Sequence, residues 1–396
     1  MRPTPEISAP ISCFRYLVSS FHIATIMLAI ASLRPASCFS TTIIRQQRNI
    51  VSPLHRHARP VMSARTRTDR QRLYSSMNSG DNDGSQWYPP SLMDHMLYRI
   101  KEVNDVPYNI KLGLIDFTIN SRVLGKVTLA VAEKLSAAGP IFELSTGTNQ
   151  PTLTLTSAAG TTVEQRTRSI ATVMEKLRGS GYITGWRDEL YPVAESFDSQ
   201  PLFLIERAAA SLLGVLEYGV HINGLVNVDN ETRMWMARRS KTKSKFPGFL
   251  DHIVAGGQPA GLSLLENVVK ECTEEAGIPP EITRQCIKPA GAISYETYGG
   301  PLKSQGEGVM NRVVLFCFDL VLPDDFVPVV TDGEVESFFT WSLEDIARSM
   351  DPEYDDPLKP NCYPVIIDYL LRSGAISPDS PKYLEILRTL RTGTCC

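Results

Sequence analysis

One segment of the chain carries a clear helical repeat of hydrophobic positions. Placed at about 100° per residue, the apolar residues of segment 263–277 fall on one narrow stripe: Leu265, Val268, Val269, Cys272 and Ala276. Such a stripe is typical of a helix that packs one face against a core. Ser263 with Glu266 forms a capping-box pattern at the start. Gly277, followed by Pro279 and Pro280, predicts the end of the helix.

Other segments show helical or strand-like patterns around this helix. Helical spacing predicts helices at 93–100, 127–135, 162–177, from 343 onward, and at 364–372. Alternating or continuous apolar runs predict strands at 141–144, 152–156, 220–226, 234–238, 290–296, 311–320 and 338–342. Strands that flank one helix, followed by further strands and a helix, predict an α/β/α sandwich after residue 217. The helix and strand patterns of residues 91–217 predict a small α+β domain. This segment contains no cluster of metal-ligating residues.

Three carboxylates lie on the helix at 263–277, away from its apolar stripe. Glu271, Glu274 and Glu275 are three or four residues apart or adjacent, so they gather on one face and repel each other. A solvated helix face is the simple explanation of such a cluster. However, the preceding loop contains Gly256-Gly257, and a glycine backbone can approach a phosphate closely. Hard carboxylate oxygens beside such a loop favour a site for Mg²⁺ or Mn²⁺.

The same segment resembles a Nudix box, Gly-x5-Glu-x7-Arg-Glu-U-x-Glu-Glu-x-Gly-U, where U is apolar. The residues that match it are Gly256, Glu271, Glu274, Glu275, Gly277 and Ile278. Two residues depart from it: Leu262 stands at the first glutamate, and Lys270 stands at the arginine. Lysine keeps the charge of arginine but lacks its bidentate fork, so both departures leave the number of bound metal ions open.

Flanking motifs are similar to those of a narrower group of Nudix hydrolases. This group carries an N-terminal domain related to the one fused to fungal thiamine pyrophosphokinase. The matching motifs are Ile205-Glu-Arg-Ala, Tyr218-Gly-Val-His-Ile-Asn-Gly224, Pro247-Gly-Phe-Leu-Asp251, Asp332-Gly-Glu-Val-Glu336 and Leu358-Lys-Pro-Asn361. The resemblance spans about residues 90–390. It implies a Nudix α/β/α sandwich with a mixed sheet at 218–375, an upstream domain at 91–217 and a tail at 376–396.

The resemblance also implies a reaction and a set of site residues. Nudix enzymes hydrolyse a diphosphate linked to another moiety, so Glu271, Glu274 and Glu275 are the expected metal ligands, with Glu274 and Glu275 closest to the chemistry. The metal would polarise the diphosphate and activate a water. A general base outside the box is expected at Glu334 or Glu336, although a charged turn explains those two residues equally well.

A run of basic residues at 238–245 precedes the glycine-rich loop. Either it is a solvated loop, or it supplies positive charge to a diphosphate through residues such as Arg239 and Lys241. With Gly256, Gly257 and Lys270, these two residues form the expected substrate-binding set.

The substrate itself is implied mainly by the resemblance. Relatives with this upstream domain are associated with damaged, oxidised thiamine diphosphate, which they cleave to the monophosphate and phosphate. The alternative substrate is an oxidised nucleotide such as 8-oxo-dGDP, because aromatic residues would stack on either ring. A non-catalytic Nudix module that binds a diphosphate ligand or a protein is a different class of function. Such modules usually lack the central glutamates, and this chain keeps them.

Composition narrows the class of protein and its partners. The chain has 396 residues, 43% of them hydrophobic and 21% charged, which is ordinary for a globular protein of about two domains. A net charge of −3 gives no reason to expect nucleic acid as a partner. Its eight cysteines show no Cys-x-x-Cys spacing, so Cys272 and Cys317 are expected to be buried free thiols. A small-molecule diphosphate is therefore the expected partner, and the oligomeric state stays open.

The N-terminal segment has the composition of a targeting sequence. Residues 7–68 contain no acidic residue. An apolar run from Tyr16 to Leu33 precedes Pro35-Ala-Ser-Cys-Phe39, and 41–72 is rich in Arg, Ser and Thr. The run is interrupted by polar residues, so it predicts no stable membrane insertion. This two-part order resembles plastid presequences of algae with secondary plastids. We therefore expect a presequence at 1–72, a linker at 73–90 and a plastid location, with a mitochondrion or a tail without an address as alternatives.

Overall fold

The computed structural model describes residues 88–147, 150–243, 245–299, 308–391 and 393 of the chain. The predicted presequence and most of the predicted linker lie outside these residues. Within the described part, no helix is long and apolar enough to cross a bilayer.

The upstream region forms a four-stranded sheet, in the order β2-β1-β4-β3, with helices packed on it. Its elements are α3 (Tyr108–Leu112), β1 (Ile115–Ile119), β2 (Arg122–Val127), α4 (Leu129–Ala138), β3 (Phe142–Ser145), β4 (Thr152–Leu155), the 3₁₀ turn η1 (Ser157–Ala159), α5 (Val163–Gly179), β5 (Leu190–Val193), β6 (Phe203–Glu206) and the 3₁₀ segment η2 (Arg207–Leu213). Strands β5 and β6 form a separate antiparallel pair. This is the predicted small α+β domain.

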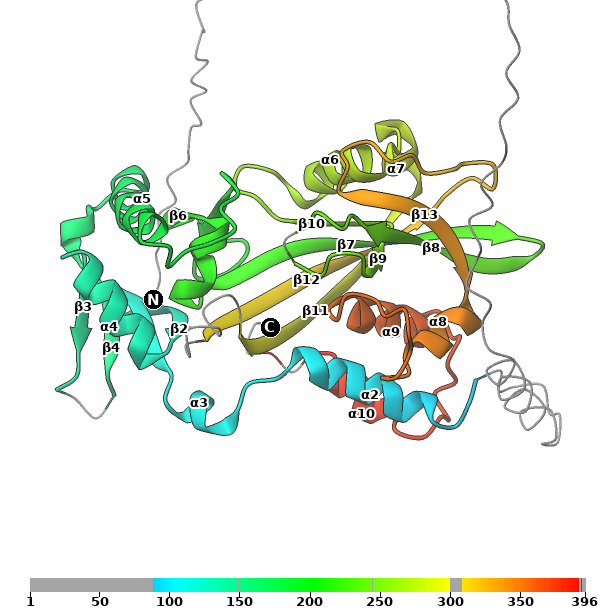
Figure 1. Ribbon diagram of the computed structural model, residues 1–396, viewed down its shortest axis with the longest axis horizontal. Coiled ribbons are helices and arrows are strands. Elements are labelled where there is room, and N and C mark those ends of the chain that lie inside the picture. Colours follow the sequence, from blue (N-terminus) through cyan, green and yellow to red (C-terminus); the bar gives the residue numbers. More distant parts are fainter. Residues whose placement is uncertain (1–87, 148–149, 244, 300–307, 392, 394–396) are drawn as a thin grey trace, which may run out of the picture. The chain divides into compact units, whose positions relative to one another are not determined.

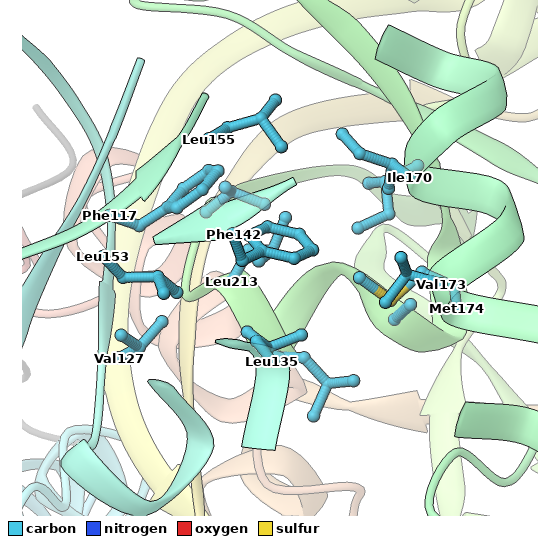
Figure 2. Close-up of a cluster of buried hydrophobic side chains, with 14 of the residues drawn as sticks. Phe117, Val127, Leu135, Phe142, Leu153, Leu155, Ile170, Val173, Met174 and Leu213 are labelled. Atoms are coloured by element: carbon cyan, nitrogen blue, oxygen red, sulfur yellow. The ribbon is translucent and has the colours of Figure 1, made fainter. Parts of the chain in front are cut away.

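Aliphatic and aromatic side chains hold the upstream region together. Figure 2 shows Phe117, Phe142 and Leu153 from the sheet facing Ile170 and Met174 of α5, and all five are buried. The stripe predicted for 162–177 is confirmed, because Ile170, Val173, Met174 and Leu177 are the buried residues of α5. Strands β1, β2, β5 and β6 were not predicted. The predicted helix at 127–135 is shifted, because Val127 ends β2 and the Thr128 side chain caps α4.

The second region contains a seven-stranded mixed sheet between two layers of helices. Its elements are β7 (Leu216–Val228), β8 (Glu231–Arg239), β9 (Leu250–His252), β10 (Val254–Gly257), α6 (Leu264–Ala276), α7 (Pro280–Cys286), β11 (Ile287–Gly299), β12 (Val309–Val321), β13 (Val335–Ser342), α8 (Leu343–Ser349), α9 (Cys362–Arg372) and α10 (Tyr383–Thr389). The main order is β11-β12-β7-β8-β13, with β10 beside β7 and β9 beside β8. Strands β7 and β12 are parallel and their other pairings are antiparallel, so the sheet is mixed as predicted.

The two faces of this sheet are covered by different helices. Figure 1 shows α6 and α7 on one side of the sheet and α8 and α9 on the other. On the first side, Val268 and Cys272 of α6 pack with Val220 and Ile222 of β7. On the second side, α8, α9 and α10 share one core with strand β8. This arrangement is the predicted α/β/α sandwich.

The helix α2 (Leu92–Val103) belongs to the second core, although it precedes the upstream sheet in the chain. Leu92, Met96 and Ile100 are buried in the same cluster as Tyr363 of α9 and Ile386 of α10. Segment 376–390, predicted as part of a tail, thus supplies a helix that packs on α2. The domain division at 91–217 and 218–375 stays a prediction, and this packing shows that residues 92–103 contact the second region extensively.

Candidate active site

Helix α6 begins and ends as predicted. The Ser263 hydroxyl accepts a hydrogen bond from the backbone N–H of Glu266 at 3.3 Å, and the backbone N–H of Ser263 donates to the Glu266 carboxylate at 2.9 Å. Gly277 closes the helix in the left-handed conformation, with φ of 62°. The predicted apolar stripe is wrong at Leu265. This residue is 42% exposed, and Leu264 packs against the core instead.

The three glutamates of α6 differ in their exposure. Glu271 is buried, Glu275 is half-buried and Glu274 is exposed, so the carboxylate face of the helix is only partly open to solvent. Strand β10 causes this burial. A Cβ atom on Gly256 would lie only 2.4 Å from the Cδ of Glu271, so this close approach requires glycine. Glu275 Oε2 accepts a hydrogen bond from the backbone N–H of Ala255 at 3.0 Å.

Burial makes negative charge costly at two of these carboxylates. Burial raises the pKa of Glu275 to about 8, against the opposing hydrogen bond from Ala255, and the charges of Glu271, Asp251 and Glu334 add to the effect. Burial also raises the pKa of Glu271, which the ammonium group of Lys270 partly offsets. A divalent cation would remove this cost, and hard carboxylate oxygens are the ligands that Mg²⁺ prefers. The donor set therefore fits a divalent metal.

Lys270 stands between two of the expected ligands. Its Nζ lies 3.1 Å from Glu271 Oε1 and 2.8 Å from Glu274 Oε2. The lysine thus holds these carboxylates in the way expected for the arginine of the box, but through one ammonium group instead of a fork. For a metal to bind both carboxylates, the ammonium group must move aside. The metal-ligand assignment of the three glutamates stays a prediction.

A second group of side chains has ligand atoms that lie close enough together to hold a metal ion. Within the described ranges, the ligand atoms of His221, His252 and Cys362 all lie within 4.8 Å of one another, and all three residues are buried. The ammonium group of Lys359 and the guanidinium of Arg239 both contact Asp251, which itself accepts a hydrogen bond from Cys362. Two fixed cations this close disfavour a third, so hydrogen bonding accounts for this group better than a metal does.

A pocket beside α6 brings together several residues that were predicted from separate segments. It is lined by Ala237, Arg239, Lys243, Asp251, His252, Glu275, Glu334 and Val335. Arg239, Glu275 and Glu334 thus line one pocket, and their roles there stay predictions. Glu336 is exposed and Lys241 is exposed, and neither lines this pocket.

Two of the pocket residues have partners that bear on their predicted roles. The guanidinium of Arg239 donates to Asp251 Oδ2 at 2.6 Å and to the backbone oxygens of Lys245 and Phe246 at 3.0 Å each, so it also holds the basic loop in place. Glu334 forms an ion pair with Lys243. Partial burial alone would raise the pKa of Glu334, but Lys243 outweighs it and the pKa lies below its usual range. This weakens Glu334 as a base, and its role as general base stays a prediction.

Sequence reasoning missed Asp251 as the centre of a buried polar cluster. Asp251 accepts hydrogen bonds from Arg239 at 2.6 Å, Lys359 at 2.9 Å and the Cys362 thiol at 2.9 Å. Beside it, Nδ1 of His221 lies 3.0 Å from Nδ1 of His252. The signal was present, because His221, Asp251 and Lys359 each belong to one of the flanking motifs. Only the fold brings these three motifs together.

The upstream region contacts the glycine-rich loop directly. A Cβ atom on Gly257 would lie 1.8 Å from the Tyr191 hydroxyl and 3.2 Å from Cζ of Arg207, so glycine at 257 admits both side chains. The backbone N–H of Ala260 donates to the oxygen of Leu190 at 2.9 Å. Arg207 in turn forms an ion pair with Glu189 at 2.8 Å. Gly257, predicted to face a phosphate, therefore faces the upstream domain.

Comparison with known proteins identifies two domains and two close relatives. A family model described as "NUDIX domain" matches residues 219–362, and one described as "Domain of unknown function (DUF4743)" matches residues 95–217. The chain is 41% identical over 286 residues to "Nudix hydrolase 24, chloroplastic" of Arabidopsis thaliana, covering 72% of this chain and 75% of that protein. It is also 41% identical over 293 residues to "Nudix hydrolase 20, chloroplastic" of the same organism, with the same coverage.

Solved structures are more distant. The NUDIX domain of Shewanella oneidensis NrtR, complexed with ADP ribose, covers 39% of this chain and 87% of its own, with 14% identity and a TM-score of 0.30. Values this low support no inference about the ligand of this chain.

Proposed function

This chain belongs to the Nudix hydrolase family, and from that premise we propose that it cleaves oxidised thiamine diphosphate to the monophosphate and phosphate. As a pyrophosphohydrolase it adds water across a diphosphate: a new P–O bond forms to the water oxygen, and the P–O bond to the bridging oxygen breaks. Hydrolases of this family use a divalent cation, which we propose to be Mg²⁺ here, with Mn²⁺ as a substitute.

The observation that carries the proposal is the polar cavity in which Glu275 of α6 meets fixed cations. Glu275, Lys243 and Arg239 line this cavity, so one of the proposed metal carboxylates lies beside positive charges that suit a diphosphate. Glu271, Glu274 and Glu275 would hold the cation, which when bound neutralises the phosphate oxygens and lowers the pKa of a coordinated water. Gly256 keeps Glu271 in place, and Lys270 holds Glu271 and Glu274 until a cation takes the place of its ammonium group. Lys243, which pairs with Glu334, adds positive charge beside Glu275.

The organic half of the substrate rests on the upstream domain. Tyr191 and Arg207 reach the glycine-rich loop, so a substrate held there lies against residues of both domains. The motifs of the upstream domain are similar to those of enzymes associated with oxidised thiamine diphosphate. Its contact with Gly257 gives this domain a physical route to influence which ring is accepted.

The test is phosphate release by the full chain with Mg²⁺, from oxidised thiamine diphosphate and, in parallel, from 8-oxo-dGDP. We expect faster release from the thiamine compound. Glu275→Gln should lower this rate by at least about 100-fold, because the site loses a carboxylate that holds the cation. Glu281→Gln, an exposed glutamate on the neighbouring helix α7, is the matched control and should keep full activity. Preferential cleavage of 8-oxo-dGDP would replace the thiamine assignment, and release from neither would favour the binding-module reading.

We further propose that the chain acts in a plastid. Two relatives at 41% identity are named as chloroplastic, and the acid-free N-terminal segment has the two-part order of a plastid presequence. A fluorescent fusion of residues 1–80, expressed in an alga with secondary plastids, should accumulate in the plastid. Accumulation in mitochondria would support the alternative address instead.

A further inference from the structure

The polar cavity lined by Glu275, Arg239 and His252 is small. Its volume is about 10 Å³. That is about the smallest space in which one water fits. Charged and polar groups of Glu275, His252 and Arg239 line it, so a water there would find the two or more partners that a bound water needs.

His252 contributes a ring nitrogen that the fold leaves without a partner. The residue is only 1% exposed. Its Nδ1 lies 3.0 Å from Nδ1 of His221, which fixes the plane of the ring. Its Nε2 is buried and has no hydrogen-bond partner among the described residues. Leaving a buried polar atom unpaired costs about 1–3 kcal/mol, so this nitrogen is expected to serve a group that enters the pocket.

On the same pocket, Glu275 is already oriented. One of its carboxylate oxygens accepts a hydrogen bond from Ala255, which places the side chain against strand β10. His252 follows directly on Asp251, whose Oδ1 accepts a hydrogen bond from the backbone N–H of His252 at 3.0 Å. The backbone at 252 is therefore held by the buried cluster, and His252 is one of the residues that line the cavity.

We propose that this cavity binds the hydrolytic water, with Nε2 of His252 accepting one hydrogen bond from it and Glu275 on its other side. His221 is then a positioning residue. Its Nδ1 accepts a hydrogen bond from the N–H at Nδ1 of His252, so Nε2 of His252 keeps a free lone pair. The proposal rests on the pyrophosphohydrolase activity but not on the identity of the organic half of the substrate. It assigns a function to His221 and Asp251 of the flanking motifs.

A kinetic test separates water binding from a purely structural role. His252→Leu removes the acceptor and keeps an apolar side chain of similar bulk, whereas His252→Asn keeps an acceptor oxygen. Measured on whichever diphosphate the wild-type chain cleaves fastest, His252→Leu should lower kcat by about 100-fold or more and change KM less than about threefold. His252→Asn should stay within about tenfold of wild type, because its amide oxygen can replace Nε2.

Cys362→Ala is the matched control for damage to the buried cluster. Cys362 contacts Asp251 but does not line the pocket, so this variant should melt at a lower temperature and keep the wild-type kcat. The proposal is overturned if His252→Leu retains kcat within about threefold of wild type. It is equally overturned if both His252 variants lose activity only in proportion to their loss of folded protein.

A second measurement uses the wild-type chain alone, so it needs no substrate and does not depend on whether a variant folds. A high-resolution crystal structure of the wild-type chain should show an ordered water within hydrogen-bonding distance of His252 Nε2, on the side of Glu275. A protein side chain in that position, or a dry cavity, would overturn the proposal. Because this result does not depend on which diphosphate is cleaved, it stays informative even if the thiamine assignment fails.

Discussion

Asp251 and Glu275 line the same pocket, yet the fold gives them opposite surroundings. Burial alone would raise the pKa of Asp251, but Lys359 and Arg239 hold it far below its usual range. Glu275 receives one backbone hydrogen bond, and burial raises its pKa to about 8. Cations of the chain neutralise Asp251, whereas a bound metal ion would neutralise Glu275 in the proposed reaction. We therefore expect Asp251 to serve stability and orientation, and Glu275 to serve the reaction.

Replacing Asp251 should have the largest effect on stability. Asp251→Asn leaves Lys359 and Arg239, both largely buried, without their counterion, so we expect a loss of about 3–5 kcal/mol in the free energy of unfolding. Asp356→Asn is the control, since Asp356 also pairs with an arginine, through two hydrogen bonds from Arg238, but its side chain is 46% exposed. It should cost less than about 1 kcal/mol. Urea unfolding measures both, and equal losses would break the comparison.

Adding a methyl group to Gly256 should disturb Glu271 while leaving Asp251 untouched. The new Cβ would overlap with the Glu271 side chain, so that carboxylate must shift. We expect Gly256→Ala to lower Mg²⁺-dependent activity by about tenfold, the equivalent of about 1.4 kcal/mol in the barrier. Gly299→Ala, at a glycine with open space around it, should leave activity unchanged. Full activity in Gly256→Ala would mean that the position of Glu271 is unimportant.

The raised pKa of Glu275 predicts how stability depends on pH without metal. Between the ordinary value of 4.5 and about 8, the folded chain holds a proton that the unfolded chain has lost, so stability falls as pH rises through this window. The pKa of His252 is lowered to about 4, so its opposite contribution falls mainly between pH 4 and 6.5.

The measurement is thermal unfolding from pH 6.5 to 8, in EDTA and in Mg²⁺. In EDTA, wild type should lose on the order of 1 kcal/mol per pH unit relative to Glu275→Gln. Mg²⁺ should reduce this difference, because it takes the place of the proton. Parallel pH profiles of wild type and Glu275→Gln in EDTA would contradict the assigned state of Glu275.

Restoring the first glutamate of the Nudix box, at position 262, should have the smallest effect of these changes, and the effect is on Mg²⁺ affinity. Leu262 is 36% exposed at the loop before α6, so Leu262→Glu adds an outer carboxylate without opening the core. We expect Mg²⁺ affinity, measured by activation of hydrolysis, to rise only a few-fold, as for other exposed charge pairs. Leu265→Glu, similarly exposed at 42%, is the control for added negative charge alone. An equal rise in both variants would mean that position 262 is not specific.

Much of the fold could be predicted from the sequence because its signals are local. The capping box at Ser263, the closing Gly277 and the apolar stripe of α6 lie within 15 residues of one another, and all but Leu265 behave as predicted. Strands β7, β8, β11, β12 and β13 of the mixed sheet were predicted, because each contains an apolar or alternating run. Strands β9 and β10 were not predicted, since β9 is mostly Asp251 and His252 and half of β10 is glycine. Strands β5 and β6 have four residues each, as the predicted β3 and β4 do, but Pro192 interrupts β5 and β6 lacks the alternation of β4.

The sequence by itself therefore determined the family and the three glutamates of α6. The tertiary structure alone decided which charges are buried and which side chains meet. Asp251 and Lys359 are 108 residues apart in the chain, yet they form one ion pair behind the pocket. The burial of Glu271 depends on Gly256 of another element, and Gly257 faces Tyr191 of another domain. Periodicity reports only which face of an element is apolar, whereas these contacts depend on how separate elements are packed together.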